Sequence, residues 1–145
     1  MKKVILNKCY GGFDVSIETY KLYAKKKGLN LYFYDYDYDY DYSEDIQDIY
    51  KKIGEPNDNR YFLHCFIKDM GDNVAISEDD YKKYSLWLNR DYREDPTLIE
   101  VVEELGEKAN SPYSNLRIVE IPDDLDYVID DDDGIETLHE KVREW

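Results

Sequence analysis

The chain has 145 residues, which matches the size of one domain. It carries 34 acidic and 19 basic side chains, a formal charge of −15, so it lacks the cationic surplus that nonspecific binding to nucleic acid or to an anionic membrane requires. No apolar run approaches the ~20 residues of a membrane span, and no signal peptide is expected. Two cysteines without a secretory signal indicate a reduced, cytoplasmic protein that is not secreted.

The first part of the chain predicts a strand, a helix and a second strand. Residues 3–7 have the composition of a strand, and a turn follows them. Ser16 is a good N-cap for a helix through Lys27, which Gly28 ends. Residues 29–34 (LNLYFY) have the pattern of the second strand. This β-α-β start predicts a crossover unit.

The remaining elements are predicted from caps, breakers and apolar spacing. Ser43 is the expected cap of a short helix over residues 44–53, residues 60–67 predict a buried strand, and residues 77–87 predict a helix. The clearest helix begins at Pro96 after the N-cap Asp95. Residues 116–121 and 127–129 predict strands, and residues 135–145 have helical spacing, with short strands as the alternative.

Together these elements predict a single α/β (or α+β) domain over residues 1–145. We expect a central mixed sheet of about 4–6 strands with about 3–4 helices. Residues 35–58 are interpreted as an acidic, Tyr/Asp-rich variable insertion in this domain.

The negative charge begins after the first predicted helix. Residues 1–29 hold seven lysines and two acids, a net charge of +5, whereas residues 30–145 hold 12 bases and 32 acids, a net charge of −20. Residues 35–48 hold seven acids and no base, and residues 120–136 hold nine acids and no base. Such blocks bind cationic partners in some proteins and are simply solvated in others.

Residues 34–42 alternate tyrosine with aspartate, and we call them the Tyr-Asp ladder. In a strand this alternation places the tyrosines on one face and the aspartates on the other, with successive aspartates roughly 6.6–7 Å apart. That spacing is comparable with the repeat of phosphates along a nucleic-acid strand. The ladder is therefore predicted to bind a partner as a mimic of nucleic acid, through Asp35, Asp37, Asp39, Asp41, Tyr36, Tyr38 and Tyr40. The alternatives are an edge hairpin whose aspartates discourage aggregation and a low-complexity expansion in a loop.

A candidate ligand turn follows the first predicted strand and consists of Cys9, Tyr10, Gly11, Gly12 and Phe13. Backbone N–H groups between a strand and a helix can hold an anion, and ligands of α/β sheets bind beyond the strand ends. The turn has neither a GxGxxG motif nor the spacing of a P-loop. A tight turn that needs positive φ is therefore the alternative.

Other candidate sites have weaker patterns. Zinc has four potential ligands, but no CxxC or HxxxH pair is present, and adjacent His64 and Cys65 would point to opposite faces of a strand. A nucleophilic pair of Cys9 and His64 would require the first strand and the 60–67 strand to be neighbours. No metal, cofactor or catalytic residue is expected, and both thiols are expected to be structural. The four potential zinc ligands are Cys9, His64, Cys65 and His139.

Two further patterns occur in the charged part of the chain. The run Asp130–Asp133 before Gly134 is similar to a calcium loop, but Ile129 would occupy its first ligand position. Arg90, Arg93 and Arg143 are expected to pair internally with aspartates, with a cationic pocket as the alternative.

Several motifs together resemble a family of small proteins from tailed bacteriophages and prophages. They are NKCYGGF (7–13), REDP (93–96), LIEVVEELGEKAN (98–110), LRIVEIPDD (116–124), Asp133-Gly134 and the EK…R…W ending. A histidine expected before the last arginine is Val142 here, which weakens a catalytic role for that end. The resemblance implies a phage or prophage accessory protein made in the bacterial host cytoplasm, and it implies no reaction. Such proteins often block host defence nucleases, including CRISPR effectors.

The sequence therefore leaves three functions open. The first is binding, without catalysis, to a basic surface of a host or phage protein. The protein would then act as an anti-CRISPR-like inhibitor or nucleic-acid mimic. It would not bind nucleic acid or membrane directly. The alternative is a small nucleotide- or metal-binding protein with its site at the turn of residues 9–13. The third is a virion or replication accessory whose acidity only aids solubility.

Overall fold

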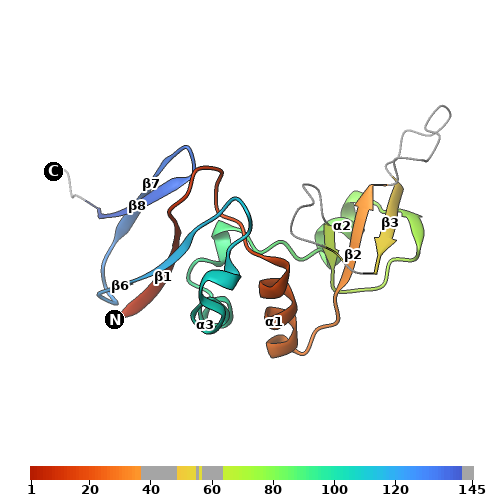
Figure 1. Cartoon of the computed structure of the whole chain (residues 1–145), viewed down its shortest axis with the longest axis horizontal. Helices are drawn as coiled ribbons and strands as arrows, with labels where there is room; N and C mark the ends of the chain where they lie inside the picture. Colours follow the sequence, from red (N-terminus) through yellow and green to blue (C-terminus); the bar gives the residue numbers. More distant parts are fainter. Residues whose placement is uncertain (37–48, 55, 57–63, 142–145) are drawn as a thin grey trace. The chain divides into compact units, whose positions relative to one another are not determined.

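The computed structural model describes residues 1–36, 49–54, 56 and 64–141, and the chain forms two compact units. Unit 1 consists of Met1–Lys26 and Leu88–Trp145, and unit 2 consists of Lys27–Trp87 (Figure 1). The α+β class is confirmed, since the described residues form three α-helices and eight strands. None of the helices in these residues is long and apolar enough to cross a membrane. The single domain over residues 1–145 stays a prediction.

Unit 1 contains two small antiparallel sheets. β1 (Lys2–Asn7) pairs with β6 (Leu116–Ile121), and β7 (Tyr127–Asp132) pairs with β8 (Ile135–Glu140). The apolar run of β1 is buried on both faces, and an isolated bridge between Lys8 and Ile135 joins the end of β1 to β8. The sheets share one core cluster, whose members are Val4, Leu6 and Ile121, with Val119, Leu125, Tyr127, Ile129 and Leu138 packed against it.

The helices of unit 1 begin where their caps predict. α1 (Ile17–Lys27) follows Ser16, whose Oγ accepts the N–H of Thr19 at 3.1 Å. α3 (Pro96–Leu105) follows Asp95, whose Oδ1 accepts the N–H of Leu98 at 2.9 Å. The apolar stripe of α3 is buried, and α3 contacts β1 and β6. Two 3₁₀-helices, η1 (Arg90–Tyr92) and η2 (Gly106–Ala109), lie on either side of α3 in the chain.

Unit 2 contains a four-stranded antiparallel sheet in the order β4-β2-β3-β5. Its strands are β2 (Tyr32–Tyr36), β3 (Ile49–Ile53), β4 (His64–Phe66) and β5 (Asn73–Ala75), and α2 (Glu78–Tyr84) follows them. The core is aromatic: Tyr34 and Phe66 are fully buried and meet edge to face at 5.3 Å between ring centroids. Tyr50 completes this cluster.

Two expectations about the sheets are wrong. β1 and β2 belong to different sheets, so the β-α-β start forms no crossover unit. The described strands form three sheets in place of one central mixed sheet, and all their pairings are antiparallel. The reason is that local periodicity identifies a strand but not its partner, and β1 pairs with β6 from the far end of the chain.

Two expected helices are strands where the structure describes them. Residues 43–48 lie outside the described residues, but Ile49–Ile53 form β3, in which Ile49 and Tyr50 are buried and paired with β5. β3 lies in the predicted insertion of residues 35–58, and it occupies an inner position of the sheet. Residues 135–140 form β8 because Asp133 and Gly134, with φ of 50° and 97°, make the two-residue turn of a hairpin.

Replacing Tyr34→Phe is expected to destabilise unit 2. The Tyr34 hydroxyl accepts the N–H of Met70 at 2.9 Å and donates to the carbonyl of Gly71 at 2.8 Å, and both groups would lose this partner. We expect the free energy of unfolding to fall by about 1–3 kcal/mol, measured by urea unfolding followed by circular dichroism. Tyr32→Phe is the control, because the Tyr32 hydroxyl makes no hydrogen bond within the described residues. Equal stability of the two variants would contradict the prediction.

Candidate partner-binding surface

The end of β1 is joined to the β7–β8 hairpin by the fully buried side chain of Asn7. Its Nδ2 donates to the carbonyl of Cys9 at 2.9 Å and to that of Gly134 at 2.6 Å. Its Oδ1 accepts the N–H of Asn115 at 2.9 Å, and its backbone N–H donates to Oε1 of Glu136 at 2.8 Å. Asn7 therefore fixes the turn after β1 against the hairpin.

Glu136 is the one buried carboxylate of the hairpin, and its side chain is 3% exposed. Arg93 binds it with two bonds, Nη1 to Oε1 at 3.2 Å and Nη2 to Oε2 at 2.8 Å, and Nη1 also donates to the carbonyl of Ile5. The guanidinium lies over the ring of Phe13, 5.5 Å from its centroid. Arg93 thus pairs internally as expected, but with a glutamate. We call Asn7, Arg93 and Glu136 the hairpin anchor.

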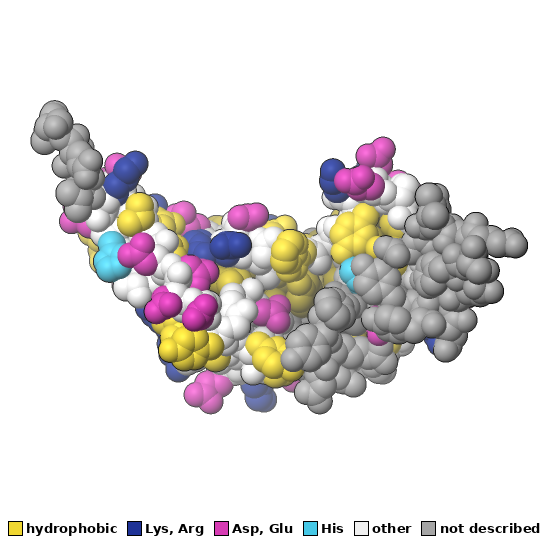
Figure 2. All heavy atoms as spheres, turned by 90° about the horizontal axis from the view of Figure 1, so that it is seen from above, with side chains coloured by type: hydrophobic (Ala, Val, Ile, Leu, Met, Phe, Trp, Pro, Cys, Tyr) yellow, Lys and Arg dark blue, Asp and Glu magenta, His cyan; other side chains and the backbone are white. Residues whose placement is uncertain are grey.

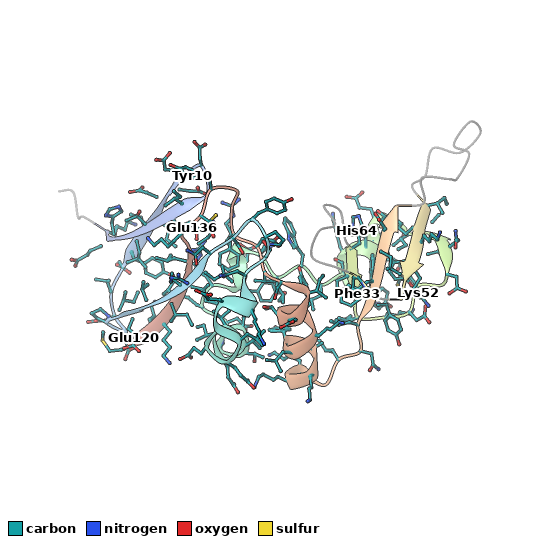
Figure 3. The ribbon with its side chains drawn as sticks, viewed as in Figure 1. Tyr10, Phe33, Lys52, His64, Glu120 and Glu136 are labelled. Atoms are coloured by element: carbon teal, nitrogen blue, oxygen red, sulfur yellow. The ribbon has the colours of Figure 1, made fainter. Side chains whose placement is uncertain are left out.

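The candidate ligand turn packs on the tip of the same hairpin. The N–H of Gly11 donates to the carbonyl of Asp133 at 3.1 Å, and a Cβ added to Gly134 would lie 2.4 Å from the nitrogen of Gly12. Gly11 and Gly12 have φ of 121° and 116°, as the tight-turn alternative requires. Figure 3 shows Tyr10 and Glu136 where β8 meets this turn. The turn therefore has a structural role, and its role as a ligand site stays a prediction.

Exposed carboxylates lie before β7, along β7 and in the turn that follows it. We call the side chains of Asp126, Asp130, Asp131, Asp132 and Asp133 the hairpin carboxylates. Asp130 contacts Nε2 of His139 at 2.8 Å, and Asp131 accepts the N–H of Gly134 at 2.7 Å. Within the described part of the chain, no lysine or arginine forms an ion pair with any hairpin carboxylate. Residues 130–134 form the end of β7 and the two-residue turn of the hairpin, so this run is not a calcium loop.

Exposed aromatic side chains lie beside the hairpin tip. Tyr10 is 68% exposed and Tyr113 is 44% exposed. Both flank Gly11, since a Cβ added there would lie 2.9 Å from the carbonyl oxygen of Tyr113. Figure 2 shows carboxylate side chains lying between hydrophobic ones on the face that it draws. Carboxylates beside exposed tyrosines make a surface suited to a cationic partner.

The acidic face of α3 is different, because lysines from the start of the chain neutralise it. Lys3 pairs with Glu103 at 2.9 Å, and Lys26 pairs with Glu100 at 2.8 Å and with Glu104 at 3.0 Å. The hydrogen bond to Glu103 raises the pKa of Lys3. Part of the positive charge of residues 1–29 is therefore used in ion pairs with the glutamates of α3.

Only the start of the Tyr-Asp ladder lies in the described residues. Tyr34 is fully buried, and Asp35 lies opposite Lys51 of β3, so neither is a free contact residue. The edge-hairpin alternative is wrong here, because β2 lies between β3 and β4. Tyr36 ends β2 opposite Tyr50. The remaining predicted contact residues lie outside the described residues, so their role stays a prediction; they are Asp37, Asp39, Asp41, Tyr38 and Tyr40.

The four potential zinc ligands are divided between the units, with Cys9 and His139 in unit 1 and the other two in unit 2. No group of three or more His, Cys, Asp or Glu side chains in the described ranges could hold a metal ion. β1 and β4 lie in different sheets, so the neighbouring strands that a Cys9–His64 pair requires are not formed. Burial raises the pKa of the Cys65 thiol to about 12, which keeps it protonated and unreactive at neutral pH.

The comparisons with known proteins give no family, since no protein-family model, no curated protein and no solved structure matches this chain. The resemblance to phage proteins therefore stays a prediction. Sequence reasoning also missed two members of the hairpin anchor, Asn7 and Glu136. The Asp133-Gly134 pair between two apolar segments was the signal that could have identified the hairpin.

Replacing Glu136→Gln is expected to destabilise unit 1 strongly. The guanidinium of Arg93, whose side chain is 12% exposed, would remain buried without a charged partner. Breaking a buried pair in this way costs about 3–5 kcal/mol of unfolding free energy, which urea unfolding measures. Glu140→Gln is the matched control, because Glu140 lies on the same strand with an exposed side chain. A loss below ~1 kcal/mol in Glu136→Gln would show that the pair is dispensable.

The two thiols are expected to differ in reactivity. At pH 8 a disulfide reagent such as DTNB should modify the partly exposed Cys9 and leave Cys65 unmodified, because the thiolate is the reacting species. Both thiols should react in urea, and Cys9→Ser should remove the reaction of the folded protein. Modification of folded Cys65 at the rate of Cys9 would be inconsistent with this structure.

Proposed function

We propose that this protein binds a basic protein surface through the β7–β8 hairpin and the tyrosines beside it, and that it catalyses no reaction. One observation carries the proposal: the hairpin carboxylates are exposed and form no ion pair with a lysine or arginine of the described residues, whereas the glutamates of α3 do. The acidity of this surface is therefore available to a partner.

The anchoring of the hairpin supports the same proposal. Asn7, Gly134 and the Arg93–Glu136 pair connect the hairpin to β1 through buried bonds. A surface that is already ordered loses little conformational entropy on binding. Clustered charge of one sign also speeds association with a partner of opposite charge, and salt weakens this effect.

The exposed tyrosines supply contact area that charge alone lacks. Tyrosine is enriched among the residues that contribute most to binding at protein interfaces. Tyr10 and Tyr113 lie beside the turn that packs on the hairpin tip, so a partner that meets the carboxylates can also cover these rings. The surface thus offers aromatic contacts next to ionic ones.

The kind of partner follows from the resemblance to phage proteins. An accessory protein of a tailed phage or prophage acts in the cytoplasm of its bacterial host, where basic grooves belong to nucleic-acid-binding enzymes. We propose a host defence enzyme of this class, such as a CRISPR effector, with the carboxylates occupying the place of phosphates. The Tyr-Asp ladder would add a second acidic row in unit 2. The nucleotide- or metal-binding alternative gains no support, because the Gly11 N–H is already bonded to Asp133.

The charge of the hairpin can be tested with two matched triple variants. Asp126→Asn, Asp132→Asn and Asp133→Asn remove three charges from the hairpin. Glu100→Gln, Glu103→Gln and Glu104→Gln remove three charges from α3. With polylysine of about 20 residues as the probe, we expect the hairpin variant to lose about tenfold or more in affinity at low salt, and the α3 variant to lose less.

The dependence on salt completes this test. The difference between the two variants should shrink as the salt concentration rises, because exposed charges are screened. Calorimetry or fluorescence anisotropy at two salt concentrations measures it. Equal affinities of the wild-type protein and the hairpin variant at every salt concentration would rule out this function.

A further inference from the structure

β7 has one edge that is paired and one edge that is open. Its described partner is β8, and the other side of β8 is joined to Lys8 at Ile135. The N–H of Lys141 donates to the carbonyl of Asp126 at 2.8 Å, which marks these residues as a hydrogen-bonded pair. Such pairs alternate along an antiparallel ladder, so in β7 residues 128, 130 and 132 bond to β8.

It follows that the main chains of Tyr127, Ile129 and Asp131 point away from β8. Their N–H and C=O groups face the open edge, where no described strand pairs with them. The side chains of Tyr127 and Ile129 pack on the core of unit 1, which holds this edge in the extended form. An open, ordered edge of this kind accepts an added strand.

The charge of the hairpin decides which strand can be added. No lysine or arginine occurs between Arg117 and Lys141, and the outer face of β7 presents Asp130 and Asp132 beside Val128, which is 43% exposed. A second copy of β7 would place like carboxylates against these and be repelled. A strand with lysine or arginine at alternate positions would instead form cross-strand pairs of opposite charge.

We propose that an extended, lysine- or arginine-containing segment of the partner adds to β7 as a further antiparallel strand. This inference rests on the proposed function and names the form of the partner: an unfolded or loop segment, bound through its main chain as well as its charges. Its basic side chains lie opposite Asp130 and Asp132 on the outer face of β7, and the side chains that alternate with them point to the face of Tyr127 and Ile129.

Two synthetic peptides test this proposal. The first has ten residues that alternate lysine and valine. The second has the same sequence, but every second backbone nitrogen is methylated, so that the edge that would pair with β7 has no N–H groups. We expect the first to bind about tenfold or more tightly than the second. NMR hydrogen exchange should show that it slows exchange at Tyr127, Ile129 and Asp131 by at least about tenfold, while Val128, Asp130 and Asp132 are already slow in the free protein.

The other outcomes separate this inference from the proposed function. Salt-sensitive binding of both peptides with equal affinity, without protection at the three amides, would overturn strand addition and leave the acidic surface as the binding site. Binding of neither peptide at low salt would overturn both, and the aspartates would then only protect the edge from aggregation. Protection that grows with protein concentration in the absence of peptide would assign the edge to a second copy and would also overturn the proposal.

Discussion

The Arg93–Glu136 pair connects parts of unit 1 that are far apart in the sequence. Glu136 on β8 accepts two bonds from Arg93 and one from the backbone of Asn7, and Arg93 also donates to the carbonyl of Ile5 on β1. Burial of a carboxylate is costly unless it is paired and fully bonded, and Glu136 has such partners. The pair therefore determines where the hairpin lies on β1. The glycines at the tip then allow the two main chains to approach closely.

This anchoring explains why so acidic a hairpin can be held in a defined position. Strand alternation places Glu136 and Leu138 of β8 on the inner face, and the same register places Asp130 and Asp132 of β7 on the outer face. The inner face packs on the rest of unit 1 through the core cluster and the hairpin anchor. The outer carboxylates repel one another, and the free energy of the inner contacts opposes that repulsion. The same register directs the N–H and C=O groups of Tyr127, Ile129 and Asp131 to the edge of β7 that no described strand pairs with.

Local patterns in the sequence predicted much of this fold, and non-local pairing explains what they missed. Asp95-Pro96 and the apolar stripe after it predicted α3, because caps and periodicity act within a few residues. The spacing of residues 135–145 predicted a helix, but the Asp133-Gly134 turn and the pairing with β7 make residues 135–140 a strand. Neither the partner of Arg93 nor the burial of Tyr34 could be predicted, since both depend on strands distant in the sequence. The acidic block of residues 120–136 could be recognised in the sequence, but the sequence did not show that Glu136 is the one buried carboxylate of this block.

The proposed binding surface requires that the hairpin carboxylates are held in a fixed array by the buried contacts of the hairpin anchor. NMR relaxation of the backbone amides of residues 130–134 in the free protein measures this most directly. We expect order parameters of about 0.85, as in rigid secondary structure. Values below about 0.6 across the turn would mean that the aspartates sample many positions, and that the array does not exist before a partner binds.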